Sequence, residues 1–179
     1  AENGQRLWHY QTVHHDLWDR DLPTTPNLVT VTHNGVKIDA VAQVTKSGYV
    51  FLLDRDTGKP LFTIEERPVK RSDLKGEETW PTQPFPVKPP PFARQHFSEE
   101  EITDISPEAH EYVKTIWTTT RTGEQFIPPS IEGTMYFPGF DGGAEWGGAS
   151  YDSNTGVLYV NANEMPWIQH MVELELDMG

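Results

Sequence analysis

The fold is decided by residues 28–64, which read LVTVTHNGVKIDAVAQVTKSGYVFLLDRDTGKPLFTI. Runs of β-branched, aliphatic and aromatic residues alternate there with three turn signals, Asn34-Gly35, Ser47-Gly48 and Asp54–Gly58. Such runs, separated by turns of this kind, are typical of β-hairpins. The stretch therefore predicts a four-stranded antiparallel meander, the unit from which β-propellers are built. The predicted strands are 28–32, 36–45, 49–53 and 59–64.

The same turn chemistry occurs at two other places in the chain. Asp152–Gly156 joins a strand that ends near Tyr151 to the apolar run 157–160. Near the amino terminus, Asn3-Gly4 precedes Trp8, as in the turn and last strand of an earlier unit. In each place an Asp or Asn side chain can cap the turn while a Gly accepts a positive φ. Three imperfect copies predict an all-β repeat architecture, a partial β-propeller.

A long insertion separates the two strand-rich regions. Residues 81–91 are Pro-rich and predict an extended, polyproline-like segment, because Pro cannot donate to a regular hydrogen-bond ladder. Ser98 and Glu101 have the spacing of a capping box, and Ser106-Pro107 offers a second helix start. We interpret the insertion as one elaborate loop with little apolar material of its own. The expected elements are a turn at 99–104 and a helix near 107–117, within an insertion at 65–127.

Composition excludes several classes of function. The chain has 179 residues, with 14 basic and 27 acidic side chains and a formal net charge of -13. A field this negative repels phosphate backbones and anionic membrane surfaces, so nucleic acid is excluded as a partner. The chain has no Cys, which excludes disulfides, thiolate catalysis and Cys-ligated metals. Its apolar runs are all shorter than the roughly 18–20 residues that a membrane-spanning helix needs.

Residues 14–23 are the first candidate for a functional site. They read HHDLWDRDLP, a dense group of His, Asp and Trp just after an expected strand. A carboxylate beside aromatic surface loses hydration, which raises its pKa and suits it to general-base chemistry. A capped, hydrogen-bonded turn explains the same cluster without any site. The two His could bind a metal, but neighbours in an extended chain point to opposite sides.

Two further features could carry chemistry. Lys46 lies at the corner between two apolar strands, where a Lys either blunts a sheet edge or donates to an anionic or carbonyl oxygen. Residues 139–149 read GFDGGAEWGGA, and such Gly-rich backbone can approach a flat ligand or another strand closely. Trp146 within it either stacks on a planar cofactor or acts as a wedge between sheets. Composition alone leaves these alternatives open.

Taken together, these segments resemble the quinoprotein dehydrogenases of the membrane-bound glucose dehydrogenase type, which carry pyrroloquinoline quinone (PQQ) in an eight-bladed β-propeller. HHDLWDRDLP is the most specific of the matching segments, and their order along the chain strengthens the resemblance. In chain order the matching segments are 3–11, 14–23, 45–54, 128–134, 137–139 and 145–148.

The resemblance implies roles for four residues. Asp16 matches the family's catalytic Asp, the general base that removes the substrate hydroxyl proton as hydride passes to C5 of the quinone. Lys46 matches the basic residue that hydrogen-bonds the quinone oxygens and stabilises charge developing there. Trp146 and Glu145 lie in the loop that reaches the cofactor and are assigned to cofactor binding. Related alcohol dehydrogenases have Asn-Trp where this chain has Glu145-Trp146.

The resemblance also implies a divalent ion, Ca²⁺ or Mg²⁺, which polarises the quinone and prefers oxygen ligands. Asp16 could contact this ion. The remaining metal ligands, and a Trp that stacks on the cofactor, are expected to precede Ala1.

Length limits how much of the propeller these residues contain. Eight blades of about 40–45 residues need more than about 300 residues, so 179 residues cannot close the ring. Repeat units need neighbours to bury their faces, so the isolated chain is expected to be inactive and prone to self-association. The expected divisions are the end of one blade with the active-site loop (1–26), one four-stranded blade (27–64), the insertion (65–127) and the start of the next blade (128–179).

The function that the resemblance implies is oxidation of the hydroxyl of a glucose-like sugar or a polyol in the periplasm, with electrons passing to ubiquinone. Any anchor in the inner membrane would lie outside these residues. Two alternatives remain: a quinate, glycerol or alcohol dehydrogenase of the same superfamily, and a non-catalytic propeller-like scaffold or binding module. The joint presence of Asp16 and Lys46 favours an enzyme, because a scaffold needs neither.

Overall fold

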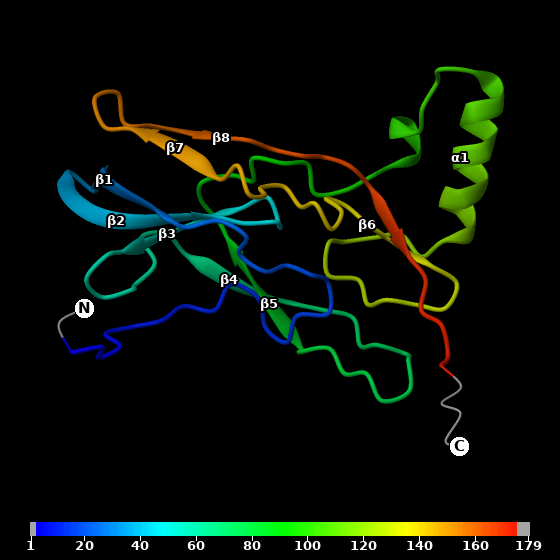
Figure 1. Ribbon diagram of the computed structural model, residues 1–179, viewed down its shortest axis with the longest axis horizontal. Coiled ribbons are helices and arrows are strands. Elements are labelled where there is room, and N and C mark those ends of the chain that lie inside the picture. Colours follow the sequence, from blue (N-terminus) through cyan, green and yellow to red (C-terminus); the bar gives the residue numbers. More distant parts are fainter. Residues whose placement is uncertain (1–2, 175–179) are drawn as a thin grey trace.

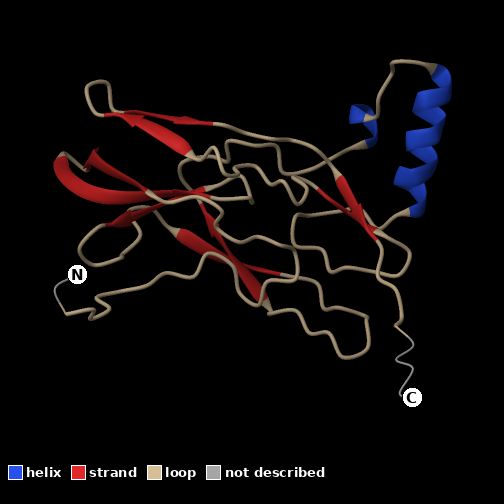
Figure 2. Ribbon diagram, in the orientation of Figure 1, coloured by secondary structure: helices blue, strands red, loops and turns tan. Residues whose placement is uncertain are grey.

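The computed structural model describes residues 3–174, which form short β-strands and one peripheral helix (Figures 1 and 2). The all-β class predicted from the sequence is confirmed. In chain order the elements are β1 (Asn27–His33), β2 (Val36–Val44), β3 (Val50–Asp54), β4 (Ile64–Pro68), β5 (Thr82–Pro86), the 3₁₀ turn η1 (Glu99–Glu101), α1 (Pro107–Thr119), β6 (Thr134–Tyr136), β7 (Ala149–Asp152), β8 (Val157–Val160) and β9 (Trp167–Gln169).

β1, β2 and β3 form one antiparallel sheet in that order, as the sequence predicted. The β1–β2 connection is Asn34-Gly35, with positive φ at both residues (51° and 78°). This is the requirement of the two-residue hairpin turn whose twist matches the flanking strands. Three of the four predicted strands of the meander are therefore confirmed.

The fourth predicted strand, 59–64, does not form. Pro60 makes only an isolated bridge to Leu53, after which the chain leaves the sheet. Pro60 itself takes a position that needs no donor, since the flanking hydrogen bonds run from the Asp54 N–H to the Lys59 carbonyl (2.8 Å) and from the Leu61 N–H to the Leu52 carbonyl (2.9 Å). Phe62 then packs edge-on against His33, with ring centroids 5.0 Å apart. The prediction is wrong beyond Leu61, where the chain leaves the sheet beside this aromatic contact and continues into β4.

The Pro-rich segment contains a strand that the sequence did not predict. β5 pairs with β4 in antiparallel register, and Val87 just beyond it donates a backbone hydrogen bond to Thr63 (3.0 Å). Hydrogen-bonding positions alternate along an antiparallel strand, so Pro84 and Pro86 occupy positions that need no donor. The polyproline-like expectation is therefore wrong for 82–86.

The helical part of the insertion agrees with the sequence. α1 begins after Ser106, whose hydroxyl accepts a hydrogen bond from the Ala109 N–H (3.1 Å), and it ends two residues beyond the expected 117. η1 lies within the expected turn at 99–104. α1 buries none of its residues and stands apart from the strands that hold the site (Figure 1). Among the described residues, no helix has the length and apolar character needed to cross a membrane.

The three repeated turns share one capping arrangement. Asp54 Oδ1 accepts the Asp56 N–H (3.1 Å), and Asp152 Oδ1 accepts the Asn154 N–H (2.9 Å). Asn3 Oδ1 accepts the Gln5 N–H in the same way (3.0 Å). The repeat inferred from turn chemistry is therefore present in the backbone.

Trp8 packs onto one of these turns. Its indole N–H donates to the carbonyl of Arg55 (2.9 Å). A Cβ placed on Gly58 would lie 2.6 Å from the indole ring, so only Gly fits beneath it. Trp8 thus joins the amino-terminal segment to the Asp54–Gly58 turn of the first sheet.

The main apolar core lies between the β1–β2–β3 sheet and the β7–β8 hairpin. Asn27 donates to the Ala149 carbonyl (3.0 Å), and the Tyr151 hydroxyl donates to the Thr30 carbonyl (2.9 Å), so the two sheets are also tied by hydrogen bonds. A second core, formed by Trp18, Phe126, Ile127 and Tyr136, underlies residues 14–21. The buried residues of the main core are Val29, Ala40, Ala42, Val44, Val50 and Ala144.

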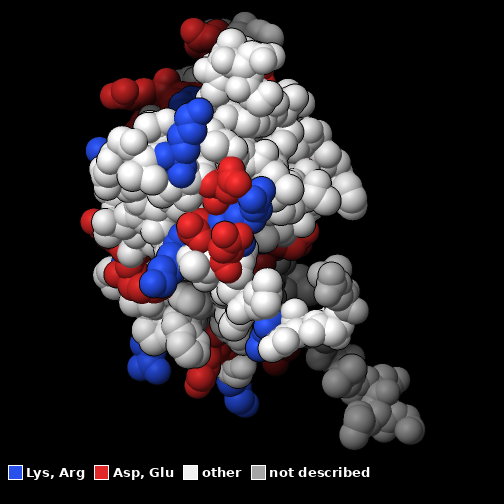
Figure 3. Space-filling view, turned by 90° about the vertical axis from the view of Figure 1, so that its left-hand side faces the viewer, with Lys and Arg blue, Asp and Glu red and all other residues white. Residues whose placement is uncertain are grey.

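On the face at the left of Figure 1, basic and acidic side chains lie close together (Figure 3).

Candidate active site

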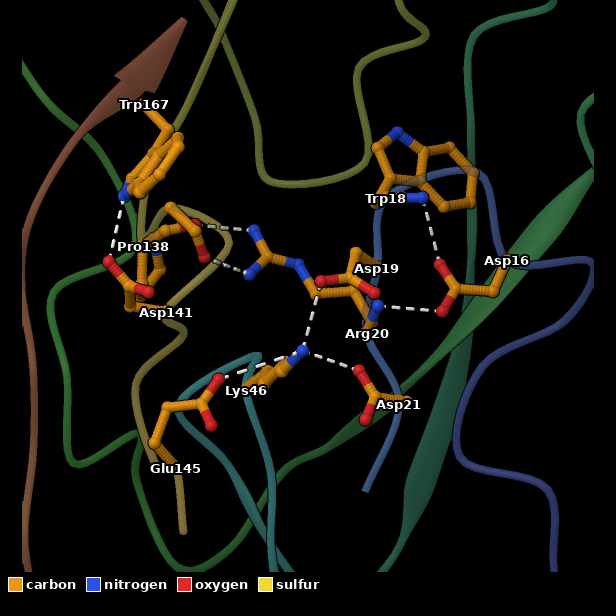
Figure 4. Close-up of polar contacts among 11 residues, drawn as sticks. Asp16, Trp18, Asp19, Arg20, Asp21, Lys46, Pro138, Asp141, Glu145 and Trp167 are labelled. Atoms are coloured by element: carbon orange, nitrogen blue, oxygen red, sulfur yellow. Dashed lines mark hydrogen bonds and ion pairs between the residues drawn. The ribbon is translucent and has the colours of Figure 1, made fainter. Parts of the chain in front are cut away.

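The segment 16–21, named the carboxylate loop, alternates between buried and exposed side chains. Trp18 and Arg20 are buried, with 0% and 2% of their surface exposed, whereas Asp19 and Asp21 are exposed. The loop bends at 17–18 and has left-handed backbone at Asp19, so this alternation is a property of the folded loop and not of a regular strand. Trp18 and Arg20 anchor the loop from within, and the two Asp carboxylates point toward Lys46 (Figure 4).

Trp18 anchors the loop to the second core. Its indole N–H donates to the Ile127 carbonyl (2.7 Å), and its ring meets Phe126 edge-on with centroids 5.1 Å apart. Both interactions are buried, where an unpaired indole N–H would carry a large desolvation penalty. This anchoring fixes where the exposed carboxylates of the loop can lie.

Asp16 closes the loop on itself. Its Oδ1 accepts the Trp18 N–H (2.8 Å) and its Oδ2 accepts the Arg20 N–H (2.6 Å). Asp side chains commonly stabilise tight turns by accepting backbone N–H groups in this way. The capped-turn interpretation therefore describes the contacts of Asp16 within the described residues.

Asp19 has a left-handed backbone, with φ of 56°. This region costs an L-residue roughly 1–2 kcal/mol, and Asp and Asn tolerate it better than most. Strain of this type is often retained at functional sites. Here the unusual φ lets the Asp16-capped loop turn while directing the Asp19 carboxylate toward Lys46 (Figure 4).

Lys46 lies at the centre of the candidate site. Its side chain is 7% exposed, and its Nζ lies 3.0 Å from Asp19 Oδ2 and also contacts Asp21 Oδ1. Glu145 Oε1 lies 3.6 Å away on a third side. Burial lowers the pKa of Lys46, but hydrogen bonds to Asp21 and Asp19 outweigh burial and raise the pKa above its usual value. Lys46 is therefore a firmly charged ammonium group at neutral pH.

The Gly-rich loop, residues 139–148, packs directly on the corner that carries Lys46. The Gly143 N–H donates to the Lys46 carbonyl (2.5 Å). A Cβ on Gly142 would lie 2.6 Å from the Lys46 Cα, and one on Gly143 would lie 2.6 Å from the Gly48 Cα. The loop needs Gly at these positions because it approaches another backbone segment closely, which was one of the two alternatives drawn from its composition.

Trp146 follows Glu145 in this loop and is 84% exposed. Within the described residues Trp146 is therefore not wedged between sheets, because a wedge would be buried. Glu145 has 27% of its side chain exposed and faces Lys46. The structure therefore brings Glu145 to Lys46 and leaves the neighbouring indole open to solvent.

Two members of the site were not singled out from the sequence. Asp19 and Asp21 make the direct contacts to Lys46, whereas the family resemblance points to Asp16 in the same cluster. The missed signal was the two-residue alternation Trp18, Asp19, Arg20, Asp21, which separates anchors from outward-facing groups. Arg20 was also missed, since a basic residue between two acidic ones is typical of a solvated segment.

Fold and site together define a class: a segment of a β-propeller enzyme with a buried Lys enclosed by carboxylates between neighbouring sheets. The family model described as "PQQ: Glucose/ethanol/alcohol dehydrogenase, beta-propeller domain" matches residues 1–177, and the chain belongs to this family. The resemblance to quinoprotein dehydrogenases and the partial propeller fold, both inferred from the sequence, are thereby confirmed.

Several curated relatives are similar over almost the whole chain. The quinoprotein glucose dehydrogenase of Gluconobacter oxydans is 36% identical over 176 residues, covering 96% of this chain and 21% of that protein. The quinoprotein glucose dehydrogenase of Escherichia coli is 35% identical over 178 residues, covering 96% and 22%. The probable quinate dehydrogenase (quinone) of Xanthomonas campestris pv. juglandis is 36% identical over 171 residues, covering 94% and 22%. The chain thus spans about a fifth of the length of these relatives.

A solved structure supports the fold. The quinohaemoprotein alcohol dehydrogenase of Pseudomonas putida HK5 superposes with a TM-score of 0.55 and 22% sequence identity, covering 96% of this chain and 20% of that chain. At this level of identity the likeness concerns the arrangement of the backbone only.

The residues around Lys46 fit the oxygen-rich edge of a quinone. An ammonium group has three N–H donors. Asp19 and Asp21 accept from two of them, and Glu145 Oε1 at 3.6 Å lies beyond a normal hydrogen bond. The third N–H can therefore donate to a carbonyl oxygen, and the exposed Trp146 indole offers an aromatic surface nearby in the sequence.

A complete metal site is not formed by these residues alone. Within 3–174, no group of three or more His, Asp or Glu side chains is arranged to hold a metal ion. The three carboxylates that meet at Lys46 enclose an ammonium group instead. A bound ion would need ligands beyond those that the described residues bring together.

Proposed function

We propose that this chain is part of a PQQ-dependent dehydrogenase that oxidises a hydroxyl group of a glucose-like sugar or a polyol. Family membership supports the PQQ-dependent oxidation, and relatives at 35–36% identity named as glucose dehydrogenases support the substrate class. The observation that carries the proposal is the buried Lys46 ammonium group with Asp19, Asp21 and Glu145 around it. Hydroxyl oxidation uses a group that accepts the hydroxyl proton and a donor that stabilises negative charge on the hydride acceptor, and a carboxylate and an ammonium group can supply these.

Lys46 is proposed to bind the cofactor through its third N–H. When bound, PQQ supplies the electrophilic carbonyl carbon that accepts hydride from the substrate. Lys46 would donate a hydrogen bond to a quinone oxygen and stabilise the negative charge that develops there. The raised pKa of Lys46 supports this role, because the group stays protonated while the charge develops. Trp146 and Glu145 are proposed to contact the cofactor from the Gly-rich loop.

The general base is proposed to be a carboxylate of the carboxylate loop. The resemblance selected Asp16, yet both Asp16 oxygens already accept backbone N–H groups of the turn. The Asp19 carboxylate is 60% exposed and lies 3.0 Å from the Lys46 ammonium group. Its contacts favour Asp19 as the group that takes the hydroxyl proton, with Asp16 holding the loop. The substrate would lose that proton to the carboxylate and a hydride to the bound cofactor, which together make a two-electron oxidation.

The remaining parts of the function are also proposed from the resemblance. The complete protein would work in the periplasm with Ca²⁺ or Mg²⁺, to which Asp16 could contribute an oxygen, and would pass electrons to ubiquinone. Exposed sheet faces in the isolated chain would favour self-association. An inner-membrane anchor, if the protein has one, would be supplied by other residues.

The substrate class has a specific alternative. Relatives named as quinate and glycerol dehydrogenases are 36% and 32% identical to this chain, close to the glucose dehydrogenases. A quinate, glycerol or alcohol dehydrogenase of the same family is therefore the second candidate.

The test uses the full-length protein that contains this chain, loaded with PQQ and Ca²⁺, and an artificial electron acceptor. We expect glucose or another sugar to reduce the acceptor faster than glycerol, quinate or ethanol. Lys46→Met should lower kcat by about 100-fold or more, while the matched variant of an exposed residue, Lys59→Met, should leave it within twofold. PQQ-independent activity, or full activity of Lys46→Met, would contradict the proposal. Faster oxidation of quinate or glycerol would select the second candidate.

A further inference from the structure

Arg20 occupies an unusual place beside the site. It lies between Asp19 and Asp21, yet its side chain points the opposite way and is buried. Its Nη1 donates to the Gly139 carbonyl (2.8 Å) and its Nη2 donates to the Pro138 carbonyl (2.5 Å). Figure 4 shows the guanidinium group extending away from Asp16 toward Pro138. Two parallel N–H donors on adjacent carbonyls make a geometrically restrictive contact.

The two carbonyls lie where the Gly-rich loop begins, since Gly139 is its first residue and Pro138 precedes it, and the loop then returns to the site. Gly143 donates to the Lys46 carbonyl (2.5 Å), and Glu145 Oε1 lies 3.6 Å from the Lys46 Nζ. Arg20 therefore links the carboxylate loop to the Gly-rich loop across 119 positions of sequence. These two loops carry all three carboxylates that meet at Lys46.

Arg20 makes directed contacts at the cost of burying a charge. Its described hydrogen-bond partners are neutral carbonyls, and its Nε is buried with no hydrogen-bond partner among the described residues. Burial lowers the pKa of Arg20 to about 10, against the attraction of Asp16, so the group remains charged at neutral pH. An apolar replacement would avoid the cost of burying a charge but would leave the Pro138 and Gly139 carbonyls without their donor. The two directed hydrogen bonds are what an apolar side chain of similar length would lack.

We propose that Arg20 is a positioning residue of the oxidation reaction: by binding the Pro138 and Gly139 carbonyls, it fixes the carboxylate loop against the Gly-rich loop and so sets where Asp19 and Glu145 lie around Lys46. This inference rests on the proposed function. It extends that function to a residue whose side chain faces away from Lys46.

The first test is kinetic and uses the PQQ-loaded full-length protein. Arg20→Met should lower kcat by about 10- to 100-fold and leave KM within about threefold, because misplacing reacting groups affects the chemical step. Arg20→Lys, which keeps the charge and loses the two-pronged contact, should lower kcat by about 10-fold. The matched control is Arg55→Met, which removes an exposed pair with Asp39 (2.6 Å) and should leave kcat within twofold.

The second test needs no cofactor. Acetylation of lysines in the cofactor-free full-length protein is followed by peptide mass spectrometry, and the rate at Lys46 is divided by the rate at the exposed Lys59. Arg20→Met and Arg20→Lys should raise this ratio by about fivefold or more, since a released carboxylate loop uncovers the 7%-exposed Lys46 side chain. Thr134→Val removes a buried hydroxyl that donates to the Pro128 carbonyl (3.2 Å), so it controls for general destabilisation.

The outcomes separate the inference from the proposed function. Parental kcat and parental Lys46 acetylation in Arg20→Met and Arg20→Lys would overturn the positioning role. An equal rise in Lys46 acetylation in Thr134→Val would also overturn it, because the effect would then be general. If Arg20→Met does not fold, Arg20→Lys decides by the same two criteria. If the parent protein shows no PQQ-dependent oxidation, the proposed function fails, while the acetylation ratios still report whether Arg20 holds the two loops together.

Discussion

Two turns of this molecule are each capped by an Asp side chain, and each contains a residue with left-handed backbone, which is Gly in one turn and Asp in the other. In the turn 54–58, Asp54 accepts backbone N–H groups and Gly58 has φ of 70°. In the carboxylate loop, Asp16 accepts backbone N–H groups and Asp19 has φ of 56°. A Trp holds each of them by donating its indole N–H to a carbonyl, Trp8 in the first and Trp18 in the second.

The difference separates a turn that serves the fold from a turn that serves the site. Left-handed backbone is nearly free for Gly and costs an L-residue roughly 1–2 kcal/mol. Gly58 lies beneath Trp8, and nothing but shape is required of it. Asp19 carries the same backbone strain together with a carboxylate on Lys46. Strain retained together with a charged contact supports the proposal that the Asp19 side chain acts in the reaction.

The largest effect is expected when Asp19 in the carboxylate loop is replaced by Gly, the residue with left-handed backbone in the other turn. Asp19→Gly should lower kcat of the PQQ-loaded full-length protein by about 100-fold or more, because the proposed base is lost. The same change should alter the free energy of unfolding by less than about 1 kcal/mol, because Gly relieves the left-handed strain but also removes a contact to Lys46. Steady-state kinetics and thermal unfolding measure the two effects. Unchanged kcat would place the base elsewhere, and a loss of stability well above about 1 kcal/mol would show that Asp19 supports the fold instead.

The reverse change tests the turn 54–58. Gly58→Ala should lower the free energy of unfolding by about 2–4 kcal/mol, because it adds backbone strain and a clash with the Trp8 ring 2.6 Å away. Gly156→Ala is the matched control: φ is 73°, but no atom lies within 4 Å of the new Cβ, so only the strain of about 1–2 kcal/mol applies. Denaturant unfolding measures both. Equal losses in the two variants would show that Trp8 does not pack as described.

The two Trp anchors sharpen the comparison further. Trp18→Phe leaves the buried Ile127 carbonyl without its donor and should cost about 1–3 kcal/mol of unfolding free energy. Trp8→Phe removes a donor from the exposed Arg55 carbonyl, which water can replace, and should cost less than about 1 kcal/mol in hydrogen bonding. A larger loss for Trp8→Phe, measured by denaturant unfolding, would reverse the ranking of the two anchors.

The smallest expected effect is on pH dependence. Hydrogen bonds from Thr57 lower the pKa of Asp54, so Asp54 stabilises the folded state above about pH 4 and loses that contribution as pH falls. The pKa of Lys46 is raised, so its contribution is present below about pH 10 and is lost as pH rises through the folded-state pKa. Asp54→Asn should flatten the acid side of a stability profile, and Lys46→Met the alkaline side. An unchanged slope in either variant would contradict the corresponding contact.

Much of the fold could be predicted from local signals. The hairpin at Asn34-Gly35, the Asp-capped turns and the Ser106-capped helix all follow from backbone chemistry within a few residues. The errors arise where a distant partner decides. Pro84 forms part of β5 because β4 pairs on the side that needs no donor, and 59–64 leaves the first sheet where Phe62 meets His33.

For the candidate site, the sequence selected residues that the structure brings together, but it did not predict their contacts. Lys46 and Glu145 were selected from the resemblance, and the structure brings them together. The sequence could not rank the three Asp residues of the carboxylate loop, because their roles depend on backbone angles and on which side chains turn inward. The burial of Arg20 was equally hidden, since its partners lie 118 and 119 positions away.

The most direct test of the account compares Asp19→Asn with Asp16→Asn in the PQQ-loaded full-length protein. The measured quantity is the rate of cofactor reduction in a single turnover after mixing with substrate, together with the amount of bound PQQ. We predict that Asp19→Asn slows reduction by about 100-fold or more with PQQ still bound, and that Asp16→Asn, which keeps one turn hydrogen bond, slows it by less than about 10-fold. Rapid reduction in Asp19→Asn with loss of reduction in Asp16→Asn would contradict the assignment and make Asp16 the base.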